Sequence, residues 1–139
     1  MTQKIRKKIL VIDDHPMMHR ELEKILSAQG FEFLGCFDAI SGIRKVKESL
    51  PDLVLLDMML PELDGKQVVR SIKTDEETKH IPVIFITATL SKRDDKKEKT
   101  IDVDGVTYPA FAKPLFYLKL ISTIRHLIDE NEKSKGISA

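Results

Sequence analysis

Five short runs of apolar residues, separated by segments with helical periodicity, constrain the fold of this chain more than any other feature. The runs are Ile9–Ile12, Phe31–Cys36, Leu53–Leu56, Val83–Ile86 and Ala110–Ala112. A run such as Leu53–Leu56, which has no polar face, is typical of a strand buried on both sides of a sheet. Strands that alternate with helices form mostly parallel sheets with helices on both faces. The pattern therefore predicts an α/β fold of five repeated strand–helix units.

Four apolar stripes at helical spacing lie between or after these runs. The first helix should begin near Pro16 and stop at Gly30, because proline suits a first helical turn and glycine suits a helix end. The second should begin after Asp38 and end before Pro51. The stripes are Met18, Leu22, Ile25 and Leu26; Ala39, Ile43, Val46 and Leu50; Val68, Val69 and Ile72; and Phe116, Leu120, Ile121, Ile124, Leu127 and Ile128.

Two segments depart from this regularity. In KRDDKKEKTIDVD (92–104), ten of thirteen residues are charged and only Ile101 and Val103 are apolar. A fourth helix is expected there, either weakly docked or partly irregular. Residues 131–139 lack apolar periodicity, so we expect a flexible C-terminal tail or the start of a linker.

Size and composition indicate one ordinary domain. The chain has 139 residues, of which 42% are hydrophobic and 32% charged, and its formal net charge is +1. This balance, with basic and acidic residues intermingled, gives no indication of direct nucleic-acid binding. The basic start MTQKIRKK precedes only four apolar residues, too few for a secretory signal or for membrane insertion. The single cysteine, Cys36, suits a small buried strand residue, and the expected location is cytoplasmic.

Two of the apolar runs end in carboxylates. Asp13 and Asp14 follow the first run, and Asp57 follows the third. The carboxyl ends of parallel strands open on one edge of the sheet, where ligands bind in folds of this class, so we expect the three carboxylates to converge. Clustered carboxylates repel one another unless a cation joins them, and an all-oxygen site with open coordination positions suits Mg²⁺.

Two more polar residues end strands at the same edge, Thr87 after the fourth run and Lys113 after the fifth. A hydroxyl and an ammonium group beside a carboxylate are suited to bind the oxygens of a phosphoryl group. An aspartate can attack phosphorus to form an acyl phosphate, with positioning and charge neutralisation supplying most of the catalysis. Each residue alone is more often a helix cap, turn or surface residue, but five suitable residues at four strand ends indicate a site.

The segments VIDDHP, LLDMMLPELDG, FITA and KP, in this order, resemble the signature segments of response-regulator receiver domains of two-component signalling, of the chemotaxis-regulator type. The resemblance covers roughly residues 8–129. It implies a flavodoxin-like (βα)5 doubly wound parallel sheet with strand order 2-1-3-4-5, and a receiver domain at residues 1–130. It also implies a phosphodonor, either a histidine kinase or a histidine phosphotransfer protein, and an unknown downstream protein target.

The resemblance assigns the metal site residue by residue. Asp57 is the expected phosphoacceptor. Asp14, Asp57 and the backbone carbonyl of Met59 are expected to ligate Mg²⁺ directly, and Asp13 is expected to act through a water molecule. Pro61 and Gly65 are expected to shape the loop after the acceptor strand.

The resemblance also assigns the phosphate-binding and switch residues, which are Lys113, Thr87 and Ala88. Lys113 would pair with the phosphate, and Thr87 would move toward it. The Lys113–Pro114 peptide bond is commonly cis in this family.

The chain departs from the family pattern at the switch aromatic. That aromatic usually lies three residues before the lysine, where this chain has Ala110, so Phe111 or Tyr108 is the possible substitute. The family's output surface includes the fourth-helix region. Because weakly packed elements change state for a small free energy, residues 90–105 are the expected route by which phosphorylation alters that surface.

Met59 argues against an enzyme that turns over its acyl phosphate. Aspartate-nucleophile phosphatases place a second aspartate two residues after the nucleophile as a general acid and base, and Met59 cannot transfer a proton. The expected protein is therefore a phosphoaccepting signalling domain that assists its own phosphorylation and dephosphorylates itself slowly.

Two more classes of protein agree less well with these residues. A module that only binds partners is disfavoured by the retained acids, Thr87 and Lys113, and a nucleotide-binding domain is disfavoured because no G-x-G-x-x-G loop follows any strand. A receiver domain cut from a larger regulator or hybrid kinase stays open. His15 and His19 have a metal-like spacing, but His15 precedes Pro16 and should lie outside the helix, which disfavours a zinc site.

Overall fold

The computed structural model describes residues 5–88 and 99–134. Its strands are β1 (Lys8–Ile12), β2 (Glu32–Cys36), β3 (Leu53–Asp57), β4 (Val83–Thr87), β5 (Lys99–Val103) and β6 (Val106–Ala112). Its helices are α1 (Pro16–Ala28), α2 (Ala39–Ser49), α3 (Gly65–Lys73) and α4 (Tyr117–Ser134). Each of the five predicted apolar runs lies in a strand, apart from Phe31, which directly precedes β2.

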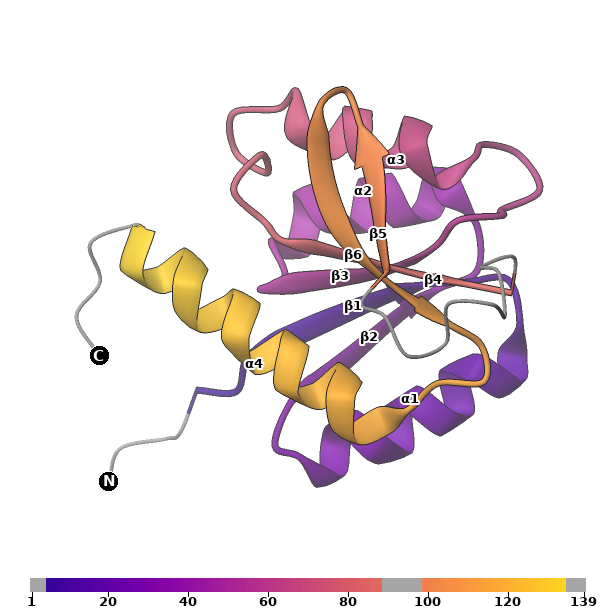
Figure 1. The fold of residues 1–139 in the computed structure, drawn as a ribbon, viewed down its shortest axis with the longest axis vertical. Coiled ribbons are helices and arrows are strands. Elements are labelled where there is room, and N and C mark those ends of the chain that lie inside the picture. Colours follow the sequence, from indigo (N-terminus) through magenta and orange to yellow (C-terminus); the bar gives the residue numbers. More distant parts are fainter. Residues whose placement is uncertain (1–4, 89–98, 135–139) are drawn as a thin grey trace.

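The strands form one sheet in the order β2-β1-β3-β4-β6-β5, with α2 and α3 on one face and α1 and α4 on the other (Figure 1). The first four strands and β6 pair in parallel, and β5 pairs antiparallel with β6 at the edge. With β6 as the fifth parallel strand, the predicted order 2-1-3-4-5 is confirmed. The prediction of a flavodoxin-like, doubly wound sheet is confirmed as well.

The central strand explains why its sequence has no polar face. All five residues of β3 are buried. Val54 and Leu56 belong to one core cluster, which includes residues of α2 and α3. Leu53 and Leu55 belong to the other, which includes residues of α1 and α4. Because successive side chains of a strand point to opposite faces, a strand between two helical layers must be apolar at every position.

Helix ends follow the local chemistry of the sequence. Pro16 is the first residue of α1, and Gly30, beyond its end, has a φ of +86° that suits glycine. Asp38 caps α2, because its side chain accepts a hydrogen bond from the Ser41 amide at 2.8 Å. Asp64 and Gln67 form a capping box at the start of α3.

The prediction of a helix within residues 92–104 is wrong for residues 99–104, the part that the structure describes. Residues 92–98 lie outside the described residues, and Lys99–Val103 form β5, which turns through Asp104 and Gly105 into β6. Both turn residues have positive φ angles, 53° and 85°, and Val103 pairs with Val106. A two-residue turn with two positive φ angles matches the twist of antiparallel strands, and Asp–Gly is a favoured pair for it. Of the expected route 90–105, residues 99–105 therefore belong to a hairpin.

The last helix differs from expectation at both ends. The apolar stripe predicts Phe116 on this helix, but Phe116 precedes it and is 81% exposed, whereas Leu120, Ile121, Ile124 and Ile128 are buried. α4 continues to Ser134, so residues 131–134 of the expected tail are helical, and 135–139 lie outside the described residues. Neither α4 nor any other helix in the described ranges has the length and apolarity needed to cross a membrane.

Gly42 shows how closely α2 packs on the sheet. A Cβ atom at this position would lie 2.6 Å from Ile12 Cδ1 and 2.9 Å from its Cγ1 and Cγ2 atoms, and Ile12 is fully buried. Alanine favours a helix over glycine by about 1 kcal/mol. Overpacking of a core costs about 1–3 kcal/mol, so we expect Gly42→Ala to lower the net free energy of unfolding, measured by urea denaturation.

Arg44→Ala is the control, because Arg44 is an exposed residue of the same helix. Its free energy of unfolding should differ from that of the parent by no more than about 0.5 kcal/mol. A Gly42→Ala protein as stable as the parent, or more stable, would show that Ile12 can shift without cost.

Candidate functional site

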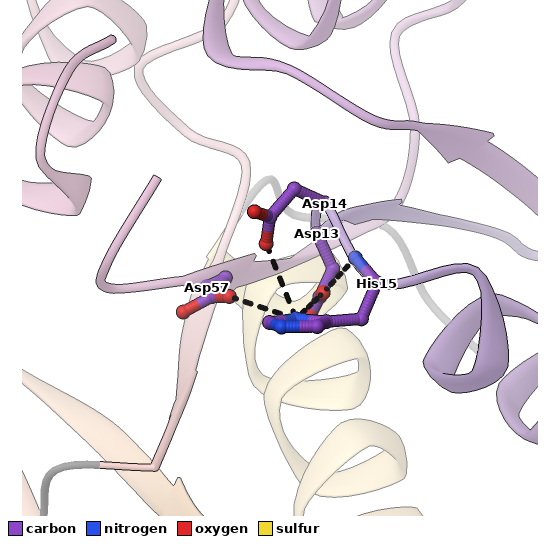
Figure 2. Close-up of side chains that lie close together, drawn as sticks. All are labelled: Asp13, Asp14, His15 and Asp57. Atoms are coloured by element: carbon purple, nitrogen blue, oxygen red, sulfur yellow. Dashed lines mark hydrogen bonds and ion pairs between the residues drawn. The ribbon is translucent and has the colours of Figure 1, made fainter. Parts of the chain in front are cut away.

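The three predicted carboxylates converge at the carboxyl edge of the sheet. Asp13 and Asp14 follow β1, Asp57 ends β3, and Ile12 of β1 lies beside Leu56 of β3. Asp13, Asp14, His15 and Asp57 each offer a ligand atom, and these atoms lie within 4.8 Å of one another (Figure 2). Asp13 and Asp57 are buried, whereas Asp14 is partly exposed. The expected convergence is thus present, and His15 joins it.

Backbone groups hold the two buried carboxylates. Asp57 Oδ1 accepts a hydrogen bond from the Met59 amide at 3.0 Å. Asp13 Oδ1 accepts one from the His15 amide at 2.8 Å. These bonds hold each carboxylate against the backbone of the loop that follows its strand, so the positions of both carboxylates are set by the backbone.

His19 supports the end of β1, a role that the sequence does not predict. It lies in α1 and is buried, and its Nε2 is 2.6 Å from the carbonyl oxygen of Asp13. Because a carbonyl only accepts hydrogen bonds, this nitrogen donates. A Cβ atom at Gly35 of β2 would lie 2.6 Å from His19 Nδ1, so glycine leaves room for the ring. The sequence does contain one indication that His19 is buried: it lies three and seven residues before Leu22 and Leu26, on the same face of the helix.

Lys113 reaches the same carboxylates from the end of β6. Its Nζ lies 2.8 Å from Asp13 Oδ2 and 3.3 Å from Asp57 Oδ2, with 15% of the side chain exposed. Burial lowers the pKa of Lys113, but the adjacent Asp13 and Asp57 carboxylates raise it more, so the net pKa is raised. The ammonium is therefore charged at neutral pH. The Lys113–Pro114 bond is cis, as the resemblance implied.

Asp57 is held in conditions that disfavour its charge. Burial raises the pKa of Asp57, the amide of Met59 lowers it, the negative charge of Asp13 raises it, and Lys113 lowers it, with a net rise. Desolvation and a neighbouring like charge both favour the neutral acid. An added cation would oppose both effects.

Thr87 and Ala88 lie where the sequence predicted, at the end of β4. Thr87 is fully buried as the last residue of the strand, and Ala88 follows it in an exposed bend. The amide of Lys113 donates to the carbonyl of Thr87 at 3.0 Å, which ties the two strand ends together.

Gly65 brings the start of α3 close to the acceptor strand. Its amide donates to the carbonyl of Met58 at 2.8 Å. A Cβ atom there would lie 3.0 Å from Met58 Cα and 3.3 Å from the carbonyl oxygen of Asp57, which are backbone atoms. The loop after Asp57 thus needs glycine at this point.

The two candidate switch aromatics lie on opposite faces of β6. Ala110 and Tyr108 belong to the core cluster beside α2 and α3. Phe111 packs against the cluster beside α1 and α4. Tyr108 is buried, and its ring contacts Phe85 edge to face at a centroid distance of 6.0 Å. Because a shift of two residues keeps the face of a strand, Tyr108 is the candidate on the same face as the usual position.

The donor set of the site fits a hard divalent cation. Asp13 Oδ2 and Asp14 Oδ1 are buried and have no hydrogen-bond partner in the described part of the chain, although they lie within ion-pair distance of Lys113 and His15, respectively. Buried carboxylate oxygens without donors are costly unless a cation binds them. Oxygen ligands suit Mg²⁺, so the residues present agree with the predicted ion.

Comparison with known proteins identifies relatives of this chain. Residues 9–124 match the family described as the response regulator receiver domain. The polar-differentiation response regulator DivK of Brucella ovis is 28% identical over 124 residues, an alignment that covers 89% of this chain and 98% of that protein.

Solved structures share the fold. The receiver domain of a sensor histidine kinase from Pseudomonas aeruginosa PAO1, with a magnesium ion coordinated in its active-site cleft, matches with a TM-score of 0.76 and 25% identity over 90% of this chain and 99% of that one. A CheY-like response regulator receiver domain protein from Methanospirillum hungatei JF-1 has a TM-score of 0.78 at 23% identity, with 94% and 99% coverage. The latter supports the fold alone.

Proposed function

This chain belongs to the response regulator receiver domain family of two-component signalling, and from that premise we propose that Asp57 accepts a phosphoryl group from a phosphohistidine. The donor is a histidine kinase or a histidine phosphotransfer protein. An oxygen of Asp57 bonds to phosphorus, the phosphorus–nitrogen bond breaks, and its electron pair returns to the imidazole of the donor. The phosphorylated form then binds a downstream protein.

The placement of Asp57 carries this proposal. Its side chain is only 3% exposed at the tip of β3, yet Lys113 and Asp13 converge on it from two other strand ends. The amide of Met59 fixes Oδ1, and Lys113 lies 3.3 Å from Oδ2. A carboxylate held rigidly beside a charged ammonium is suited to attack phosphorus and to keep the product neutralised.

The other strand ends bind the transferred group. Lys113 pairs with its oxygens, and Thr87 and Ala88 receive it at the end of β4. The hydrogen bond between the Lys113 amide and the Thr87 carbonyl supports a coupled response of these two strand ends.

The residues that would hold Mg²⁺ are Asp14, Asp57 and the carbonyl of Met59, with Asp13 acting through a water molecule. When bound, the ion supplies positive charge that offsets the charge of the phosphoryl oxygens. Lys113 occupies one side of Asp13 and Asp57, so it contributes positive charge to the same cluster.

Intact-mass measurement after incubation with a small phosphodonor and Mg²⁺ tests the proposal. We expect one phosphoryl group per chain, which hydroxylamine should remove because it cleaves acyl phosphates. A chain that gains no phosphoryl mass, or one whose label resists hydroxylamine, would contradict an aspartyl phosphate.

The lifetime of the phosphoryl group should depend on Met59. Met59 is 60% exposed, and its side chain cannot donate or accept a strong hydrogen bond that aligns an attacking water. We expect Met59→Asn to speed self-dephosphorylation on the order of tenfold, about the value of one added hydrogen bond. The decay of the phosphoryl mass after removal of the phosphodonor gives the rate.

Met59→Leu is the matched control, because it keeps the bulk and still offers no hydrogen bond. Its decay rate should equal that of the parent. If Met59→Leu speeds the decay as much as Met59→Asn, the effect comes from packing of the loop and the hydrogen-bond argument is wrong.

A further inference from the structure

His15 places a nitrogen atom among the three carboxylates. Its Nδ1 lies 3.0 Å from Asp13 Oδ1, 3.2 Å from Asp14 Oδ1 and 4.0 Å from Asp57 Oδ2. Figure 2 shows the ring of His15 beside all three side chains. The side chain is 66% exposed, so its ring lies at the solvent side of a cluster whose other members are more buried.

The backbone sets this position. His15 precedes Pro16 in an extended conformation, with φ −97° and ψ 113°, and its amide donates to the same Asp13 oxygen that its ring approaches. The side chain forms no capping hydrogen bond with α1. Its ring is therefore directed to the acids and has no role in starting the helix.

The distances match those between ligands of one metal ion. With metal–ligand bonds of about 2.1 Å, adjacent octahedral ligands are about 3.0 Å apart and opposite ligands about 4.2 Å apart. Of the two acids proposed as direct ligands, Asp14 Oδ1 at 3.2 Å from Nδ1 agrees with an adjacent position and Asp57 Oδ2 at 4.0 Å with an opposite position. Asp14 Oδ1 is a buried atom without a hydrogen-bond partner in the described ranges, and it lies 3.2 Å from Nδ1, so both atoms can bind the same ion.

We propose that His15 is a metal ligand that shifts the preference of this site from Mg²⁺ toward later first-row transition ions such as Co²⁺ and Ni²⁺. Carboxylate oxygens alone suit Mg²⁺, whereas an imidazole nitrogen binds transition ions much better than it binds Mg²⁺. In the free protein, Nδ1 approaches Asp13 as a hydrogen-bond partner. In the loaded protein, it gives its lone pair to the ion. The inference rests on the proposed metal site and adds a ligand to it.

Metal titration of the whole chain by calorimetry, with Co²⁺ and Mg²⁺ as separate probes, tests this. His15→Asn should weaken Co²⁺ binding about tenfold and change Mg²⁺ binding less than about twofold. The visible absorption spectrum of bound Co²⁺ should also change, because a nitrogen ligand is lost. Asparagine is a preferred residue at the start of a helix, so this variant should fold as well as the parent.

His126→Asn is the matched control, since His126 is an exposed histidine of α4. Equal Co²⁺ affinity in the parent and His15→Asn, equal losses for Co²⁺ and Mg²⁺, or an equal loss in His126→Asn would each overturn the inference. Phosphoryl labelling separates the two proposals. Failure of labelling with Mg²⁺ would refute the proposed function and leave the Co²⁺ selectivity standing. Normal labelling with no His15 effect would refute this inference alone.

Discussion

Asp57→Asn should abolish acyl-phosphate formation and leave the fold intact. An asparagine amide has nearly the same shape as the carboxylate but cannot attack phosphorus to form the acyl phosphate. Burial and the charge of Asp13 raise the pKa of Asp57, so the folded protein gains nothing from the negative charge at this position. Incubation with a small phosphodonor and Mg²⁺ should add one phosphoryl mass to the parent and none to the variant.

Glu62→Gln is the control for charge, because Glu62 is an exposed acid in the loop after β3. It should be labelled as fully as the parent. Circular dichroism should show that Asp57→Asn melts at or above the temperature of the parent at neutral pH. Full labelling of a folded Asp57→Asn protein would place the phosphoacceptor elsewhere in the chain.

The sequence predicts an element well when its apolar pattern is compatible with only one position in the fold. Leu53–Leu56 cannot present a polar face, so it has to lie between two layers, and β3 does. The same pattern explains why Asp57 is informative, since a carboxylate at the end of such a strand needs a partner. Because the strands are parallel, Asp13, Asp57 and Lys113 must lie at one edge of the sheet, and this can be predicted without knowing the geometry of their side chains.

The hairpin of β5 and β6 differs from the predicted helix because the high charge of the preceding segment obscures a local turn signal. Asp104–Gly105 separates the alternating apolar residues Ile101 and Val103 from Val106 and Tyr108. An Asp–Gly pair between alternating runs is a strong local hairpin signal. For residues 99–106, the Asp–Gly turn signal therefore gives a better prediction than the expectation of a helix taken from the family pattern.

The roles of the two histidines depend on tertiary contacts that periodicity does not supply. A spacing of four residues suggests that the two histidines either bind one metal ion together or have no metal-binding role. In the structure, their side chains have different partners. His15 lies outside α1 beside the acids, whereas His19 is buried and bonds the backbone of Asp13. The burial of His19 also requires a small residue at Gly35 on the neighbouring strand, which no local pattern indicates.

Mg²⁺ should stabilise the folded chain, because the ion relieves repulsion among Asp13, Asp14 and Asp57. An ion that binds only the native state raises the free energy of unfolding by about 2.7 kcal/mol at a hundredfold excess over its Kd. Urea denaturation with and without Mg²⁺ measures the gain. Asp14→Ala should lose most of it, since Asp14 supplies a carboxylate to the cluster and is the most exposed of the three acids.

Ionic strength is the main confounding variable, because salt also screens repulsion between carboxylates. NaCl at matched ionic strength therefore accompanies each Mg²⁺ measurement, and it should stabilise the parent much less than Mg²⁺ does. In the absence of Mg²⁺, Asp14→Ala should be at least as stable as the parent, because the substitution removes one of three like charges that repel one another. A Mg²⁺ gain of equal size in the parent and in Asp14→Ala would place the ion away from these acids and would remove the basis for the proposed metal site.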